Sequence, residues 1–173
     1  EIRDDGDVKT VVTTSGEHQA RYVIIATGTK ERKMNVPGEE ENAGKGVSYC
    51  AVCDGPFFRG KEVAVVGGGN SAIEEAIYLS TIASKVHVIM RRDVFRADKI
   101  NTKKALATEN IEFHFKKKPH AVLSDDTHVT GLEIEDSDTG ELSQIEVSGI
   151  FPFVGNDPVT HFVKDLGITD EKG

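Results

Sequence analysis

Two cysteines, the only ones in this chain of 173 residues, lie three positions apart as Cys50 and Cys53. A disulfide between them would close a very small loop, and loop entropy gives such a loop about 2 kcal/mol of stability or less. The pair would be a poor structural crosslink, whereas its spacing is typical of a dithiol that is oxidised and reduced in turn. Asp54 follows directly and could supply the proton that a leaving sulfur takes up in thiol–disulfide exchange.

Other roles for this stretch stay open. A structural zinc site would need two further ligands, and the six histidines show no paired spacing that would complete one. The sequence therefore predicts no metal here, although the pair could also be accidental. Asp54 has a structural alternative as a turn or helix-capping residue before Gly55 and Pro56.

A second stretch, "KEVAVVGGGNSAIEEAIYLS", begins a few residues later. The apolar run 63–66 suits a buried parallel strand, Gly67 ends it, and Ile73, Ala76 and Ile77 recur at helical spacing. The sequence therefore predicts a strand, a glycine turn and a helix.

This turn fits the fingerprint of a dinucleotide-binding site. Gly67 would allow the tight turn, Gly69 would let a pyrophosphate approach the backbone, and the small Ala72 would let helix and strand pack closely. The phosphates would lie at the start of the helix, near Asn70 and Ser71.

Arginines follow the next predicted strand, "KVHVIM", where a binder of NAD usually has an acid. Arg91 and Arg92 end that strand, and Arg96 comes four residues later. Guanidinium groups pair well with phosphate, so this position predicts NADP rather than NAD. The alternative is a solvated loop in which the arginines pair with acids such as Asp93.

Composition excludes several other classes of protein. The content of 38% hydrophobic and 29% charged residues is ordinary for a globular chain, and no apolar run is long enough for a membrane span. The net charge of -8 argues against nucleic acid or an anionic membrane as partner. We expect a cytoplasmic protein.

Four stretches together closely resemble the NADPH-binding domain of low-molecular-weight (bacterial-type) thioredoxin reductases. They are "ATG" at 26–28, "GVSYCAVCDG" at 46–55, "VAVVGGGNSAIEEAIYLS" at 63–80 and "RRDVFRAD" at 91–98. The resemblance implies an α/β fold: a Rossmann-like NAD(P)-binding domain with three β/β/α layers, flanked by strands of an incomplete FAD domain. Residues 1–32 would belong to the FAD domain, 33–152 to the NADPH domain with its CxxC, and 153–173 to the segment that returns to the FAD domain.

The resemblance also implies roles for residues. Electrons would pass from NADPH through FAD to the disulfide and on to thioredoxin, with Cys53 nearer the flavin, Cys50 attacking thioredoxin and Asp54 as acid and base. The residues that would hold the pyrophosphate lie in the glycine turn and the start of the helix: Gly67, Gly69, Asn70, Ser71 and Ala72. Arg91, Arg92 and Arg96 would hold the 2'-phosphate. Most of the FAD site would lie outside these residues, so we expect this part alone to be inactive. The resemblance also implies that the complete enzyme is a homodimer.

Two alternatives remain. The flavoprotein subunit of alkyl hydroperoxide reductase carries a similar CxxC and glycine fingerprint but typically prefers NADH and lacks the arginine pair. A non-catalytic nucleotide-binding module with a structural CxxC belongs to another class.

The rest of the chain gives coarse predictions. We expect a linker over 29–46 and a solvated turn at 116–118. The predicted strands are 8–14, 20–26 and 111–115, the predicted helix is 97–108, and a hairpin pairs Leu132 and Ile134 with Ile145 and Val147.

Overall fold

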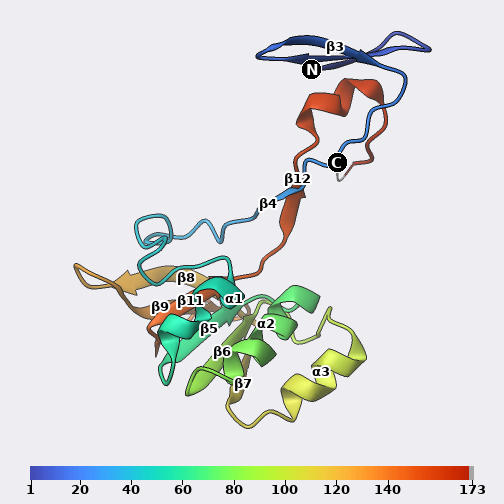
Figure 1. The fold of residues 1–173 in the computed structure, drawn as a ribbon. Helices are drawn as coiled ribbons and strands as arrows, with labels where there is room; N and C mark the ends of the chain where they lie inside the picture. Colours follow the sequence, from blue (N-terminus) through green and yellow to red (C-terminus); the bar gives the residue numbers. More distant parts are fainter. Residues whose placement is uncertain (172–173) are drawn as a thin grey trace. The chain divides into compact units, whose positions relative to one another are not determined.

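The computed structural model describes residues 1–171, and the chain divides into two compact units (Figure 1). One comprises Glu1–Glu31 with the segment that starts at Gly155, and the other comprises Arg32–Val154. None of the helices within residues 1–171 has both the length and the hydropathy that crossing a bilayer requires.

A parallel sheet forms the centre of the larger unit. Its four strands run in the order β11, β5, β6, β7, and all their pairings are parallel. Their bounds are β5 Glu62–Val66, β6 Lys85–Met90, β7 Ile111–Phe115 and β11 Gly149–Pro152. The strands predicted from the apolar run, from "KVHVIM" and over 111–115 are confirmed.

Helices lie on one face of this sheet (Figure 1). They are α2 at Asn70–Ser80 and α3 at Lys99–Leu106, and the short α1 at Ala51–Asp54 continues into the 3-10 helix η1 at Gly55–Phe58. In α2 the buried residues Ala72, Ile73, Ala76 and Leu79 recur at helical spacing, which gives the helix one apolar side. The predicted helix 97–108 is confirmed as α3, with Asp98 as its N-cap.

An antiparallel sheet supplies the third layer, with strand order β10, β9, β8. The bounds are β8 Lys117–Ser124, β9 Val129–Asp136 and β10 Leu142–Glu146. The predicted hairpin is confirmed, because Leu132 of β9 faces Ile145 of β10. The turn predicted at 116–118 is confirmed only for Lys116, which has a φ of 55°. It is wrong for Lys117 and Lys118, which already belong to β8 and form ion pairs with acids of β9 opposite them.

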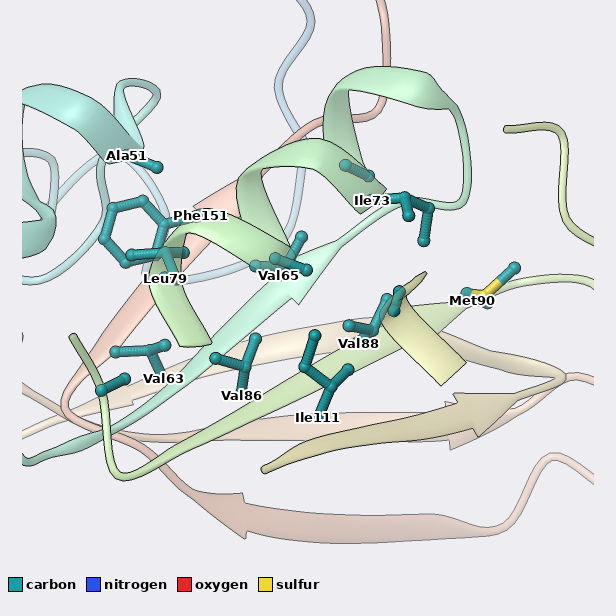
Figure 2. Close-up of a cluster of buried hydrophobic side chains, with 14 residues drawn as sticks. Ala51, Val63, Val65, Ile73, Leu79, Val86, Val88, Met90, Ile111 and Phe151 are labelled. Carbon is teal, nitrogen blue, oxygen red and sulfur yellow. The ribbon is translucent and has the colours of Figure 1, made fainter. Parts of the chain in front are cut away.

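Alternation along the parallel strands divides the core in two. Val63 and Val65 of β5 point toward the helices, where Figure 2 shows them in a cluster with Leu79. Ala64 and Val66 point the other way, into a second cluster with residues of the antiparallel sheet. The predicted three-layer β/β/α arrangement is confirmed.

The smaller unit consists of short strands and one 3-10 helix. The elements are β1 Ile2–Asp4, β2 Lys9–Thr13, β3 Gly16–Ala20, β4 Thr29–Glu31, β12 Asn156–Pro158 and η2 His161–Leu166. Strands β1, β2 and β3 form one antiparallel sheet, and β4 pairs with β12.

The strand predicted at 20–26 is wrong, because β3 begins and ends earlier. Every residue of β3 is exposed, so this strand gives no alternating apolar signal in the sequence. The apolar run that misled the prediction pairs with no strand within residues 1–171, and in it Tyr22 is 89% and Ile24 92% exposed.

Candidate functional site

The two cysteines form a disulfide at the start of α1. Cys50 is the N-cap of this helix, and its sulfur accepts a hydrogen bond of 3.2 Å from the backbone N–H of Cys53. Cys50 is half-buried, whereas Cys53 is exposed. A negative charge on the Cys50 sulfur would therefore be stabilised by a backbone amide that points at it.

Asp54 lies beside the disulfide and is held by a serine that the sequence analysis missed. The Ser48 hydroxyl donates to Asp54 Oδ2 over 2.6 Å and accepts from the backbone N–H of Cys50 over 3.1 Å. Ser48 is buried, and its own N–H donates to the carbonyl of Ile150 in β11. A hydroxyl two residues before the first cysteine was the only signal of this role in the sequence.

Exposed apolar side chains occur in α1 and η1, the segment that carries the disulfide. Val52 is 61% and Phe57 76% exposed. On the buried side, Gly55 fits against α2, where a Cβ on it would lie 3.0 Å from Leu79 Cδ2. The disulfide therefore belongs to a segment that packs against α2 on one side and exposes two large apolar side chains on the other.

A buried carboxylate holds the segment that leads into the disulfide. Glu39 is 1% exposed and accepts from the backbone N–H groups of Met34 and Asn35 and from the Tyr49 hydroxyl. The linker predicted over 29–46 contains β4 at 29–31, and the rest of it has no helix or named strand but is organised in part by this carboxylate. A glutamate within the run "GEEE" gives no sequence signal of burial.

The glycine turn after β5 has the close contacts that its sequence predicts. Gly67 has a φ of 145°, and a Cβ there would lie 2.4 Å from the Phe153 carbonyl oxygen and 2.9 Å from the Ala72 Cβ. Ala72 is fully buried. Packing within the chain therefore requires glycine at position 67 and a small side chain at position 72.

Gly69 and the first turn of α2 differ from Gly67 in this respect. A Cβ on Gly69 would meet no atom within 4 Å, so the chain leaves space there. Gly69 is the N-cap of α2 and no side chain caps this helix start. Asn70 and Ser71 are exposed in the first turn, where backbone N–H groups and the helix dipole favour an anion.

The arginine segment is tied to this turn by two hydrogen bonds. The N–H of Arg96 donates to the Gly68 carbonyl over 2.9 Å, and the N–H of Asp98 donates to Asn70 Oδ1 over 2.7 Å. This second bond also gives the Asn70 side chain a structural partner.

This attachment ties the backbone of the segment that carries three arginines to the glycine turn. Arg91, Arg92 and Arg96 are all exposed. Within the described part of the chain, none of them forms a salt bridge, including with the neighbouring Asp93. The segment therefore offers uncompensated positive charge next to a helix start with room for a ligand.

Comparisons with known proteins agree with this arrangement. The thioredoxin reductase of Bacillus subtilis (strain 168) is 44% identical over 173 residues, which is 100% of this chain and 55% of that protein. That of Mycolicibacterium smegmatis is 46% identical over 169 residues, 98% of this chain and 54% of its own length. The chain thus spans about half the length of these curated relatives.

Solved structures give the same result. The crystal structure of Lactococcus lactis thioredoxin reductase has a TM-score of 0.92 at 46% identity, with 99% of this chain and 57% of that one covered. For the T. acidophilum thioredoxin reductase the TM-score is 0.90 at 36% identity, with the same coverage of both chains. The resemblance to thioredoxin reductases is confirmed. Residues 2–173 match the family described as pyridine nucleotide-disulphide oxidoreductase, and the chain belongs to that family.

Proposed function

We propose that this chain is the NADPH-binding and dithiol part of a thioredoxin-disulfide reductase. The observation that carries this proposal is that one compact unit holds both an accessible disulfide and a glycine turn with unpaired arginines beside it. In this proposal Arg32–Val154 is the NADPH domain, and the smaller unit belongs to an FAD domain whose remainder lies elsewhere in the protein. These bounds differ by no more than two residues from those predicted as 33–152.

The residues present fit a bound NADPH. Its pyrophosphate would lie over Gly69 and the exposed first turn of α2, where the chain leaves space. The guanidinium groups of Arg91, Arg92 and Arg96 would hold the 2'-phosphate. This set also speaks against an NADH-specific alkyl hydroperoxide reductase subunit, because NADH has no group for these arginines.

The dithiol would exchange disulfides with thioredoxin in two steps. When FAD is bound, its chemistry would be the two-electron transfer from NADPH to the Cys50–Cys53 disulfide. The Cys50 thiolate then attacks the thioredoxin disulfide, so that one S–S bond forms and another breaks, and Asp54 gives a proton to the leaving sulfur. Cys53 attacks the mixed disulfide, which releases dithiol thioredoxin and restores the Cys50–Cys53 bond.

Two features near the disulfide support these roles. The N–H of Cys53 stabilises charge on the Cys50 sulfur, which favours Cys50 as the attacking thiolate. The exposed Val52 and Phe57 offer apolar surface for a protein substrate such as thioredoxin.

Exposed apolar residues in the smaller unit support the assignment to an FAD domain. Tyr22 and Ile24 would be covered by the rest of that domain. We therefore expect this chain alone to be colourless, to bind NADPH and not to reduce thioredoxin. The complete protein would be a cytoplasmic homodimer without nucleic acid or membrane as partner.

Cysteine substitutions in the complete reductase test the proposed roles. With Cys53→Ser, Cys50 attacks thioredoxin but the mixed disulfide is not resolved, so a covalent complex accumulates on non-reducing gels. With Cys50→Ser, no such complex forms. A complex trapped by Cys50→Ser instead would reverse the two roles, and trapping by neither variant would contradict the proposed activity.

A further inference from the structure

A cluster of two histidines and a glutamate lies on β6 and β7. His87 Nδ1 is 3.0 Å from His114 Nε2, and His114 Nε2 is 3.6 Å from Glu112 Oε1. All three atoms lie within 4.8 Å of one another. The strand register explains the grouping. His87 of β6 pairs with Glu112 of β7, and His114 comes two residues after Glu112, so all three side chains lie on the same face of the sheet. The two histidines are 27 positions apart in sequence, so no local spacing revealed them.

We propose that His87, Glu112 and His114 form a binding site for a divalent transition metal, with Zn²⁺ as the ion that fits best. A tetrahedral zinc ion with bonds of about 2.0 Å holds its ligand atoms about 3.3 Å apart. The distances of 3.0 and 3.6 Å from His114 Nε2 lie on either side of that value. Two imidazoles and one carboxylate are a ligand set that zinc uses, and a water molecule would take the fourth position.

A second carboxylate already orients the buried histidine. His87 Nε2 is 2.9 Å from Glu62 Oε2, and since a carboxylate only accepts, the proton of a neutral His87 lies on Nε2. The Nδ1 lone pair of His87 then points toward His114. In the metal-free chain this lone pair accepts a hydrogen bond from the His114 Nε2–H, so an ion bound there would replace that proton, and neutral His114 would carry its proton on Nδ1. A carboxylate on the far nitrogen, as Glu62 is for His87, commonly supports metal-bound histidines.

Neighbouring charges are compatible with a cation. Lys85 forms an ion pair with Glu112 through Oε2, which leaves Oε1 on the side of His114. Lys117, which also affects His114, is paired with Asp136. Around the position of the ion, the two carboxylates of Glu62 and Glu112 outnumber the one lysine that is not paired with Asp136, Lys85. The net charge of these groups is therefore negative, which favours a divalent cation.

The site lies away from the proposed nucleotide site in the fold. Val86 and Val88 of β6 face the helices, so His87 points to the opposite face of the sheet. The His87 side chain is 6% exposed and that of Glu112 46% exposed, so the site reaches from the sheet to solvent and an ion can enter. A bound ion would link β6 to β7 and, through Glu62, to β5.

Zinc titration of the oxidised chain tests the proposal. Reductant is left out, so that the Cys50–Cys53 disulfide cannot compete as a thiolate ligand. Competition with a chromogenic chelator should show one equivalent of Zn²⁺ bound, and His114→Ala should weaken binding at least about tenfold. His120→Ala, which removes an exposed imidazole near Glu135 on the same unit, is the matched control and should leave the affinity unchanged. No binding, or equal binding by wild type and His114→Ala, would overturn the proposal.

A spectroscopic readout distinguishes metal ligation from a loss of folding. In ¹⁵N NMR spectra of the unmodified chain, Zn²⁺ should shift His87 Nδ1 and His114 Nε2, while His87 Nε2 stays protonated. Glu62→Ala, which removes the orienting carboxylate, should weaken zinc binding about tenfold while the ¹⁵N–¹H spectrum of the backbone keeps its dispersion. Ligation through His87 Nε2, or no shift at either histidine, would show that the site is not the one proposed.

Discussion

Replacing Arg91 and Arg92 together by alanine tests the nucleotide site most directly. Both guanidinium groups are exposed and have no acidic partner within the described residues, so no existing ion pair has to break when a phosphate arrives. A charge-assisted hydrogen bond contributes about 1.5 to 3 kcal/mol, and exposure reduces this toward the lower value. One such contact at about 1.4 kcal/mol already gives a tenfold difference in affinity. We therefore expect the chain to bind NADPH at least about tenfold more tightly than NADH.

Isothermal titration of both nucleotides measures this preference. The double variant should lose most of its preference through weaker NADPH binding, while its affinity for NADH stays the same. Arg59→Ala removes an exposed arginine that follows η1 and serves as the control, with the preference retained. Raising the ionic strength should reduce the preference in the unmodified chain, because screening weakens exposed contacts. Equal affinities of the unmodified chain for NADPH and NADH would refute the reasoning.

Other substitutions test the glycine turn, the histidine pair and the serine at the disulfide. Gly67→Ala places a Cβ 2.4 Å from a backbone oxygen and should lower the free energy of unfolding by about 2 kcal/mol or more. A Cβ added by Gly69→Ala meets no atom within 4 Å. This second variant should keep the stability of the unmodified chain in urea but bind NADPH more weakly. Equal stability of the two variants would contradict this. Burial lowers the pKa of His114 in the folded state below its ordinary value of 6.5. As the pH falls, the unfolded state therefore binds a proton before the folded state does. The contribution of His114 to the free energy of unfolding is complete above pH 6.5 and is lost below it. In buffer with a chelator, the urea midpoint should fall between about pH 7 and about pH 5, and His114→Asn should flatten this dependence; the same slope in both proteins would exclude His114 as its source. Ser48→Ala removes a hydrogen bond to a carboxylate and should slow thioredoxin reduction by the complete enzyme about tenfold, and an unchanged rate would show that Ser48 does not position Asp54.

Sequence reasoning located β5 most directly, because this strand is buried on both faces. Such a strand is a continuous apolar run, and Gly67 marks its end. It failed for β8, whose first residues are lysines that pair with acids across the sheet. A strand supported by cross-strand ion pairs has the same composition as a solvated turn, so only the register distinguishes them.

The candidate site was also predictable only in part from the sequence. Spacing along the chain identified Cys50, Cys53 and the glycine turn, since their roles depend on neighbours in sequence. Ser48 and Glu39 were missed because they act through contacts with Asp54 and with distant backbone groups. Single serines and glutamates are common at surfaces, and burial becomes visible only when the fold is known.

We expect reduction of the disulfide to have little effect on the rest of the fold. The crosslinked residues are only three positions apart, so cleavage of the bond releases little chain entropy. The neighbouring segment is held independently, because Ala51 is buried in the core and the N–H of Ser48 is bonded to β11. In the proposed reductase, the cycle between the oxidised and reduced states would therefore proceed at nearly constant global stability, and we expect a change in redox balance to alter the chemistry of the protein while its resistance to unfolding and proteolysis stays nearly the same.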